Sequence, residues 1–442
     1  MMKKLILVLV LVAALALGCA QEQKPEATPT PTPQATPTPT PQATATPTPK
    51  FGGKTEVVIG VIGPMSLPEG TAEKNAAQLA VDEINAQGGI LGLPVKLVVG
   101  DTKLNPDTAT AEFRRLATQE NADMITGGFS SGVMSAMMEV MAETKTIFLS
   151  DASSPVHPKM VAENYDKYKY WFRVSQNNGS TFALDLAAMI DYLRSKGVEI
   201  NKVYIIRDEH VWTDPVVAGL TPLLEERGIE IVGDQKVPRG FTEYEQILLD
   251  AQDKGADLIM PILAISGTGD VLAKQWAELQ IPAILGGHDL AAIDAQFYEK
   301  TGGAANYELF LVDGGVLITS PPTEMAAKFI ENYKKKYGHY PESHQAYGAY
   351  DAVYLYKMAV EAAYKDGEKN PFDPDVVVKY LEKYKPGNPA KLTRNIAFYS
   401  NHALVWGDEY VRNFIAQWQD GKQYYLYPST VANGDLKLPP WI

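Results

Sequence analysis

Two short loops in the first half of the chain carry the residue types most suited to holding a ligand. Gly127–Gly132 follows the apolar segment Ala122–Thr126, and Asp151–Pro155 follows the apolar segment Thr146–Ser150. A helix is predicted between them, because apolar residues recur there at helical spacing. If the two strands are parallel neighbours, both loops emerge at the carboxyl edge of one sheet, where ligands of open α/β sheets bind. Hydroxyls and free backbone N–H groups, the first set at a helix N-terminus, suit a small polar or carboxylate ligand held reversibly.

The first loop also fits a catalytic pattern. Gly128–Gly132 matches G-x-S-x-G between a strand and a helix, which is the context of a hydrolase nucleophile. A triad also needs an acid and a histidine at the same sheet edge. His339, His344 and His402 follow in the chain, but none lies in a clear strand-end loop of the first α/β run. An exported serine hydrolase acting through Ser130 is therefore the alternative to a binding protein.

Other catalytic and metal motifs are absent from the sequence. Val133 stands where a phosphate-binding loop requires lysine. The 6 histidines are scattered, and His339 and His344 lie five residues apart in a proline-containing loop rather than at the i, i+4 spacing of a helical metal pair. We therefore expect no catalytic residue, no metal and no cofactor.

Strand and helix patterns alternate along most of the chain. Four β-loop-α units are predicted between Glu56 and Ser154, and a second α/β run follows from about Gly179 to Asp289. Asn105 and Pro106 supply an N-cap and a first-turn proline for a helix of the first run, and Thr242 and Glu245 have the spacing of a helix capping box in the second. Val156–Tyr170 between the runs is expected to be irregular, and Gly286–Asp289 is expected to be a loop after a short strand. Two helices and an aromatic strand-and-turn tail come last, and the tail could complete either run. The fold class predicted is α/β, with parallel central sheets in two lobes of similar build.

The first fifty residues differ in composition from the rest. Two lysines, the uncharged run Leu5–Leu17 and Gly18 describe a secretory signal peptide over 1–18. Cys19 is the only cysteine, and its place after the apolar run resembles the lipobox of lipoproteins, in which that cysteine is lipidated. Thr-Pro repeats follow, so 19–53 is predicted to be a lipidated cysteine with a semi-rigid tether.

Charge and length narrow the class of protein further. The net charge is −13, and no basic cluster interleaved with aromatics is present, which argues against a nucleic-acid partner. After Leu17 no apolar run is long enough to span a bilayer. The remaining body of roughly 390 residues exceeds one ordinary core and indicates two domains.

Four further segments carry a family resemblance. They are Ile59–Pro64, Ala80–Gly89, Ala346–Val353 and Leu438–Trp441. Together and in this order they resemble the branched-chain amino-acid-binding (Leu/Ile/Val-binding-like) family, the type I periplasmic solute-binding proteins of ABC transporters. The resemblance covers essentially all of Thr55–Ile442.

This resemblance implies two Rossmann-like lobes joined by a three-segment hinge that closes on ligand. The first lobe would hold 55–175 and 316–370, and the second 176–315 and 371–442. In the family the two hydroxyl loops hold a ligand's carboxylate and ammonium, an aromatic residue of the second lobe covers the ligand, and an acidic residue pairs with the ammonium. Carried over, the ligand-binding residues are Ser66, Ser130, Ser131, Ala152, Ser153, Ser154, Trp212, His288 and Asp289.

The function implied is that of an extracytoplasmic lipoprotein, anchored to the cell membrane through Cys19. It would bind an amino acid, branched-chain or related, or a similar small polar molecule between its lobes, without catalysis. Its partners would be the ligand and ABC permease subunits, and we expect a monomer. A ligand-sensing receptor lobe is a second alternative within the class of binding modules.

Overall fold

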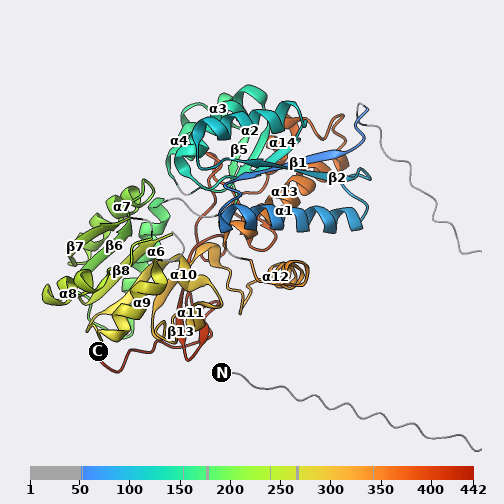
Figure 1. The fold of residues 1–442 in the computed structure, drawn as a ribbon. Coiled ribbons are helices and arrows are strands. Elements are labelled where there is room, and N and C mark those ends of the chain that lie inside the picture. The colour runs from blue at the N-terminus through green and yellow to red at the C-terminus, as the bar shows by residue number, and fades with distance from the viewer. Residues whose placement is uncertain are drawn as a thin grey trace, which may run out of the picture. The chain divides into compact units, whose positions relative to one another are not determined.

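The structure is a computed structural model, and it describes residues 51, 53–152, 154–175, 179–238, 240–264, 268–341 and 343–442. Two sheets dominate the described part, one five-stranded in the order β2-β1-β3-β4-β5 and one seven-stranded in the order β14-β13-β10-β9-β8-β6-β7 (Figure 1). The predicted signal peptide, Cys19 and most of the tether lie outside the described residues, as does Ser153.

All strands of the first sheet run parallel. The strands are β1 (Val57–Gly63), β2 (Val95–Asp101), β3 (Met124–Gly127), β4 (Ile147–Ser150) and β5 (Trp171–Arg173). Helices cover both faces of this sheet (Figure 1). They are α1 (Pro68–Ala86), α2 (Pro106–Thr118), α3 (Ser131–Thr144), α4 (Val156–Glu163), α5 (Tyr165–Tyr168), α13 (Gln345–Lys365) and α14 (Pro374–Leu381). A further helix, α12 (Glu324–Tyr337), packs against α1 and α13.

The second sheet repeats the same order in its parallel part and adds an antiparallel hairpin. Its strands are β6 (Lys202–Asp208), β7 (Glu230–Val237), β8 (Leu258–Leu263), β9 (Ile284–Asp289), β10 (Leu309–Val312), β13 (Phe414–Gln419) and β14 (Lys422–Tyr427). Its helices are α6 (Gly179–Ser195), α7 (Thr213–Glu226), α8 (Glu245–Asp253), α9 (Gly269–Glu278), α10 (Leu290–Ile293) and α11 (Phe297–Lys300). The remaining elements are the 3₁₀ turn η1 (Asp313–Gly315) and a small ribbon of β11 (Ala390–Lys391) and β12 (Asn395–Ile396).

In both sheets the strand order reverses direction next to the first strand. In the first sheet β1 pairs with β2 on one side and β3 on the other, and in the second β6 pairs with β7 and β8. Ligands of open α/β sheets bind outside the carboxyl ends of the strands at such a switch point. The fold therefore marks the ends of β1 and β3, and those of β6 and β8, as the places where a site belongs.

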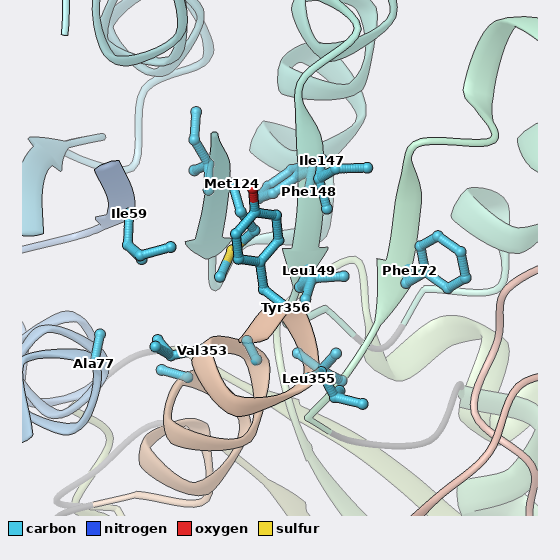
Figure 2. Packing of buried hydrophobic residues seen from close by; sticks show 14 of the residues in the cluster. Ile59, Ala77, Met124, Ile147, Phe148, Leu149, Phe172, Val353, Leu355 and Tyr356 are labelled. Atoms are coloured by element: carbon cyan, nitrogen blue, oxygen red, sulfur yellow. The ribbon is translucent and has the colours of Figure 1, made fainter. Parts of the chain in front are cut away.

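The core of the first lobe is built by α13 and α1 against the sheet. Figure 2 shows Val353 and Tyr356 of α13 close to Met124 and Leu149 of the strands, with Ala77 of α1 nearby. All five side chains are fully buried. Alanine and glycine residues on these two helices allow them to pack closely against the sheet. This packing fixes the position of the sheet and of the loops at its carboxyl edge.

The tail differs from the expected division of the lobes. Residues 371–442 were assigned by resemblance to the second lobe, but α14 and the segment through Val411 pack in the core of the first. The apolar face of α14 is buried in the core of the first lobe through Val377, Val378 and Leu381. Only the hairpin β13–β14 joins the second sheet. The sequence could not assign the tail because an aromatic-rich segment fits either core.

Three local expectations also differ from the structure. The stretch Val156–Tyr170, expected to be irregular, contains α4 and α5. The expected capping box is absent, because α8 begins at Glu245 and its N-cap is Tyr244, which makes no side-chain cap bond. Gly286–Asp289, expected to be a loop, is the end of β9, where small glycines allow β9 to lie against β8 at Pro261.

The chain passes between the two sheets three times, after Val174, after Val312 and between Val411 and Phe414. Buried ion pairs fix the crossings. Arg394 donates to the carbonyl of Val174 at 2.9 Å and contacts Asp351 at 3.0 Å. Arg412 contacts Asp185 of α6 at 3.0 Å. Across the described residues, no helix combines the length and apolar character needed to cross a membrane.

Candidate functional site

The first hydroxyl loop lies at the switch point of the first sheet. Gly127 and Gly128 adopt φ of 100° and 93°, a conformation that side chains rarely allow, and this turns the chain into α3. Ser130 is the N-cap residue of α3, with extended backbone, but its side chain makes no capping bond. Ser131 is the first helical residue. The Ser130 hydroxyl therefore stands at a helix N-terminus, where an anion is favoured.

The second loop follows β4 and is joined to the first. The Asp151 N–H donates to the carbonyl of Gly127 at 3.1 Å. Ala152 is buried, and its carbonyl and that of Ser154 accept from the Arg173 guanidinium. The Ser154 hydroxyl accepts from the Val156 N–H at 3.2 Å, which fixes it as a turn cap. Ser130, Ser131, Ala152 and Ser154 are thus at one edge, as the sequence predicted.

Ser66 belongs to the same edge through a different element. It is an exposed turn residue between β1 and α1. The Asp101 carboxylate accepts the preceding N–H, that of Met65, at 3.1 Å and holds the turn. Ser66 therefore flanks β1 on the side of β2, farther from the second loop than Ser130.

An aromatic group lies at the carboxyl edge of the second sheet. Trp212 precedes α7, and its ring is 5.5 Å from that of His288 at the end of β9, edge to face. Phe182 of α6 completes the group, 5.0 Å from His288 and 6.2 Å from Trp212. Two predicted residues, Trp212 and His288, are thus brought together. Trp212 remains partly exposed and can cover a solute.

Asp289 has a structural role that the sequence did not predict. Its carboxylate accepts from the Ala291 N–H at 2.9 Å and caps α10. Burial raises its pKa to about 7, and Glu308, whose pKa burial raises strongly, is adjacent to it. The two buried carboxyls share a site that favours one proton between them. Asp208, at the end of β6, instead holds the Ala264 N–H at 2.7 Å.

A histidine–aspartate–histidine group links both lobes at the second crossing. Asp313 of η1 lies 3.2 Å from His288 Nδ1 and 3.1 Å from Nδ1 of His344, which precedes α13. Burial lowers the pKa of His288, but the Asp313 charge outweighs burial and leaves that pKa raised. Burial lowers the pKa of His344 to about 4. His288 and Asp313 therefore form the charged pair, and His344 is the neutral partner.

Two hollows lie beside this crossing. One of about 20 Å³ is bordered by Asp313 and His344 and has room for about one water molecule. A groove of about 330 Å³ is lined from both lobes, by Pro68 and Tyr340 on one side and by Lys300 on the other. Space between the lobes at this edge is what a hinge motion requires.

The three histidines that could have served a hydrolase have partners elsewhere. His339 bonds the carbonyl of Tyr340 at 3.0 Å, and His344 contacts Asp313. His402 stacks on Phe172 and bonds Glu382 at 3.0 Å. These contacts give each of them a structural role remote from catalysis, so the hydrolase hypothesis gains no support.

Sequence reasoning missed Phe182, Arg173, Asp313 and His344. Phe182 lies on a helix among apolar residues, and Arg173 ends a buried strand, where a charge in an apolar run was an available signal. Asp313 precedes two glycines with positive φ, a turn signal at a crossing. His344 gave no such signal.

Comparison with known proteins identifies this arrangement. The periplasmic binding protein family matches residues 56–421. The chain belongs to the periplasmic binding protein family. A Leu/Ile/Val-binding protein homolog 7 from Brucella abortus is 27% identical over 413 residues, covering 85% of this chain and 92% of that protein.

Solved structures share the fold of this periplasmic binding protein. A putative branched-chain amino acid ABC transporter from Silicibacter pomeroyi has a TM-score of 0.76 at 20% identity, covering 88% of this chain and 100% of that one. The branched-chain amino acid transporter substrate-binding protein LivJ from Streptococcus pneumoniae, in complex with isoleucine, has a TM-score of 0.67 at 23% identity, covering 84% and 100%. The α/β fold is therefore that of the type I periplasmic binding proteins, as predicted. Proteins of this family bind ligands for transporters.

Proposed function

We propose that this periplasmic binding protein is the solute-binding lipoprotein of an ABC importer and that it takes an amino acid or a similar small polar solute between its lobes. The observation that carries the proposal is the pair of hydroxyl loops at the switch point of the first sheet, joined by the Asp151–Gly127 hydrogen bond. Relatives named for leucine, isoleucine and valine support the ligand class.

The chemistry of the edge suits reversible binding of a carboxylate. The Ser130 hydroxyl, unused as a cap, and the N-terminal N–H groups of α3 are neutral donors directed outward from the strand end. Neutral donors at a helix N-terminus hold an anion without forming a permanent ion pair. Ser66, Ser131 and Ser154 extend this polar edge, and Trp212 and His288 would cover the solute from the second lobe.

Closure would proceed about the three crossings between the lobes, with 55–175, 316–370 and the tail segment through Val411 moving together as the first lobe. The His288–Asp313–His344 group sits on the second crossing and touches both lobes. A solute that contacts both edges stabilises the closed arrangement only by its greater affinity for it. Binding of the solute and closure of the lobes are then thermodynamically coupled.

The anchor completes the proposal. Cys19 would carry the lipid, and the Thr-Pro segment would hold the body away from the membrane, where permease subunits receive the solute. The protein would act outside the cytoplasm as a monomer.

A thermal-shift screen tests the ligand class. The panel consists of amino acids, amides and small carboxylates. A solute that binds only the folded state stabilises it by about 2.7 kcal/mol at a hundredfold excess over its dissociation constant. A selective rise of the unfolding midpoint with one chemical group is expected, whereas no rise from any member would contradict the proposal.

Ser130→Ala tests the site itself. Losing a hydrogen bond to a charged group weakens binding of the panel's best solute by roughly 10- to 100-fold. Ser135→Ala, one turn farther along α3, is the matched control, since its hydroxyl bonds the Ser131 carbonyl at 3.3 Å instead. Equal affinity of the Ser130 variant and the control would remove Ser130 from the site.

A further inference from the structure

Two buried carboxyl groups flank the point where the hydroxyl loops begin. Glu73 of α1 lies between the ends of β1 and β3, because a Cβ added at Gly63 or Gly127 would be 2.3 Å or 3.2 Å from its Oε2. Asp151 directly follows β4, and its N–H bonds the Gly127 carbonyl at 3.1 Å. Both side chains therefore lie at the switch point, beneath the loops that we assign to solute binding.

Neither carboxyl forms an ion pair with a described lysine, arginine or histidine. Glu73 is 0% and Asp151 3% exposed, and their four oxygens lack hydrogen bonds of good geometry, although the Gly128 N–H lies near Glu73 and the Ser175 hydroxyl near Asp151. Two buried arginines lie near Asp151. Arg173 donates to the carbonyls of the second loop, and Arg394 pairs with Asp351, but both charges also act on the Asp151 carboxyl. A buried carboxylate without an ion-pair partner is costly, and either a proton or an added cation relieves that cost.

The pKa values agree with this geometry. Burial raises the pKa of Glu73 well above its usual value, and the Asp151 charge raises it further. Burial raises the pKa of Asp151 to about 7, although the nearby Ser175 hydroxyl and the two arginines oppose it, and Asp313 adds to the rise. Because burial is the largest cause of both shifts, each carboxyl favours its protonated form, and a cation that binds there takes the place of a proton.

The carboxyl edge of the second sheet also carries acidic side chains, beside the His288–Asp313 pair. Asp208 and Asp289 end β6 and β9, and Glu308 lies beside Asp289. A zwitterionic solute has no net charge, and hydroxyls and backbone groups would be enough to bind its carboxylate and its ammonium. The buried carboxyl groups are therefore better explained by a solute with an additional positive charge. An inorganic cation is not favoured, because the described residues contain no cluster of three or more histidine, cysteine or acidic side chains able to hold a metal.

We propose that the solute carries a net positive charge and that its cationic group, an ammonium or a guanidinium, lies against Asp151 with Glu73 behind it. The inference rests on the proposed solute-binding function and names the substrate class of the same site. Basic amino acids and organic diamines share this chemistry. Only a basic amino acid also has a carboxylate, which Ser130 and the N-terminus of α3 would hold.

Pairs of probes that differ by one charge test the proposal. The full-length chain in detergent is titrated calorimetrically with L-arginine and L-citrulline, with L-lysine and L-norleucine, with L-leucine, and with putrescine. The charged member of each pair is expected to bind, and the neutral member to bind at least about tenfold more weakly, the range of one charge-assisted hydrogen bond. Putrescine has amines but no carboxylate, so strong binding of putrescine would indicate a diamine site, and its absence beside arginine or lysine binding would indicate a basic amino acid site.

Variants locate the cation. Asp151→Asn and Glu73→Gln preserve shape and should each weaken binding of the charged probe about 10- to 100-fold. Asp123→Asn is the control, because Asp123 is partly buried just before β3, at the opposite edge of the first sheet, and pairs with Lys54 at 2.5 Å. Circular dichroism and the unliganded unfolding midpoint check that each variant folds, and the two independent variants guard against a fold defect in one.

The outcomes separate this inference from the proposed function. Binding of arginine, lysine or putrescine that is lost in the Asp151 and Glu73 variants and kept in the Asp123 variant supports it. Tight binding of leucine or norleucine that these variants leave unchanged overturns it while preserving the solute-binding function. No binding of any probe, together with no shift in the wider thermal screen, overturns both.

Discussion

At the scale of single residues, buried charges decide how firmly the first lobe and the crossings are held. Asp351 of α13 accepts from the Thr393 N–H at 3.0 Å and from the Thr393 hydroxyl at 2.6 Å, and it pairs with Arg394. The two side chains are 0% and 3% exposed. This pair, together with the hydrogen bond from Arg394 to the Val174 carbonyl, ties α13 to the first crossing, just after β5.

Asp351→Ala should destabilise the protein markedly. It leaves the Arg394 guanidinium buried without its counter-charge, which costs about 3–5 kcal/mol of unfolding free energy. Denaturant unfolding followed by circular dichroism measures the change. Asp366→Ala removes an exposed pair with Lys383 and serves as control, with a far smaller expected effect. Similar losses in both variants would contradict the assigned role of Asp351.

Asp289→Asn should flatten the dependence of stability on pH. The folded pKa of Asp289 is about 7, above that of a free aspartate near 3.9, so the folded state holds a proton that the unfolded state releases between about pH 4 and 7. The wild-type unfolding free energy therefore falls as pH rises through this window. The asparagine still caps α10 but cannot titrate. Urea unfolding at several pH values compares the slopes, and identical slopes would show that Asp289 titrates normally.

Some of these residues could be found in the sequence and others could not. The hydroxyl loops were predictable because strand, glycine and serine follow one another in a fixed order. Glu73 was also visible, since it falls on the apolar face of α1 with Ala76, Ala77 and Ala80. The contact of His288 with Asp313 was not, because it joins the end of β9 to the second crossing, 25 residues farther along the chain, with no shared local pattern.

At the scale of elements, capping was predicted correctly once and wrongly once. Asn105 accepts from the Thr108 N–H at 2.9 Å and caps α2, as Asn-Pro before a helix predicts. Thr242 was expected to cap a helix with Glu245, but α8 begins at Glu245 itself. A capping box forms only if the helix starts directly after the Ser or Thr of the motif. Here the buried Tyr244, and not Thr242, directly precedes the helix.

Asn105→Ala and Thr242→Ala should therefore differ. The first removes a side-chain cap and costs about 1 kcal/mol of unfolding free energy. The second is an exposed substitution without a cap and should stay within about 0.5 kcal/mol. Chemical denaturation of both variants gives the comparison. A larger loss in the Thr242 variant would restore the capping box.

Edge strands and the tail were the elements that the sequence concealed. β7 is a sheet-edge strand with mostly exposed or half-buried residues, so it lacks the apolar run of a central strand. The hairpin β13–β14 completes the second sheet from a distant part of the chain. Such pairings depend on long-range contacts that local patterns do not specify.

At the scale of the whole molecule, the parallel parts of the two sheets share one strand order, so each lobe has its own switch point at the carboxyl ends of its strands. That duplication, rather than any one motif, explains why the family resemblance extends over the whole body. Membership of the periplasmic binding protein family agrees with it.

Cys19→Ser should release the protein from membranes. A lipidated cysteine partitions the chain into the membrane, and serine cannot carry a thioether-linked lipid. Cell fractionation with immunoblotting should find the wild type in the membrane fraction and the variant in the soluble exported fraction. Radioactive palmitate should label only the wild type. Membrane association that persists in the serine variant would contradict lipid anchoring at Cys19.

The central claim is that this protein binds one small solute reversibly between its lobes. Isothermal titration calorimetry of the full-length chain with single amino acids and diamines tests it most directly. We predict saturable heat at one solute per chain for one chemical group, with a negative heat-capacity change from closure over apolar surface, and weakened binding in Ser130→Ala. Folded protein that gives no heat with any of these solutes would contradict the claim.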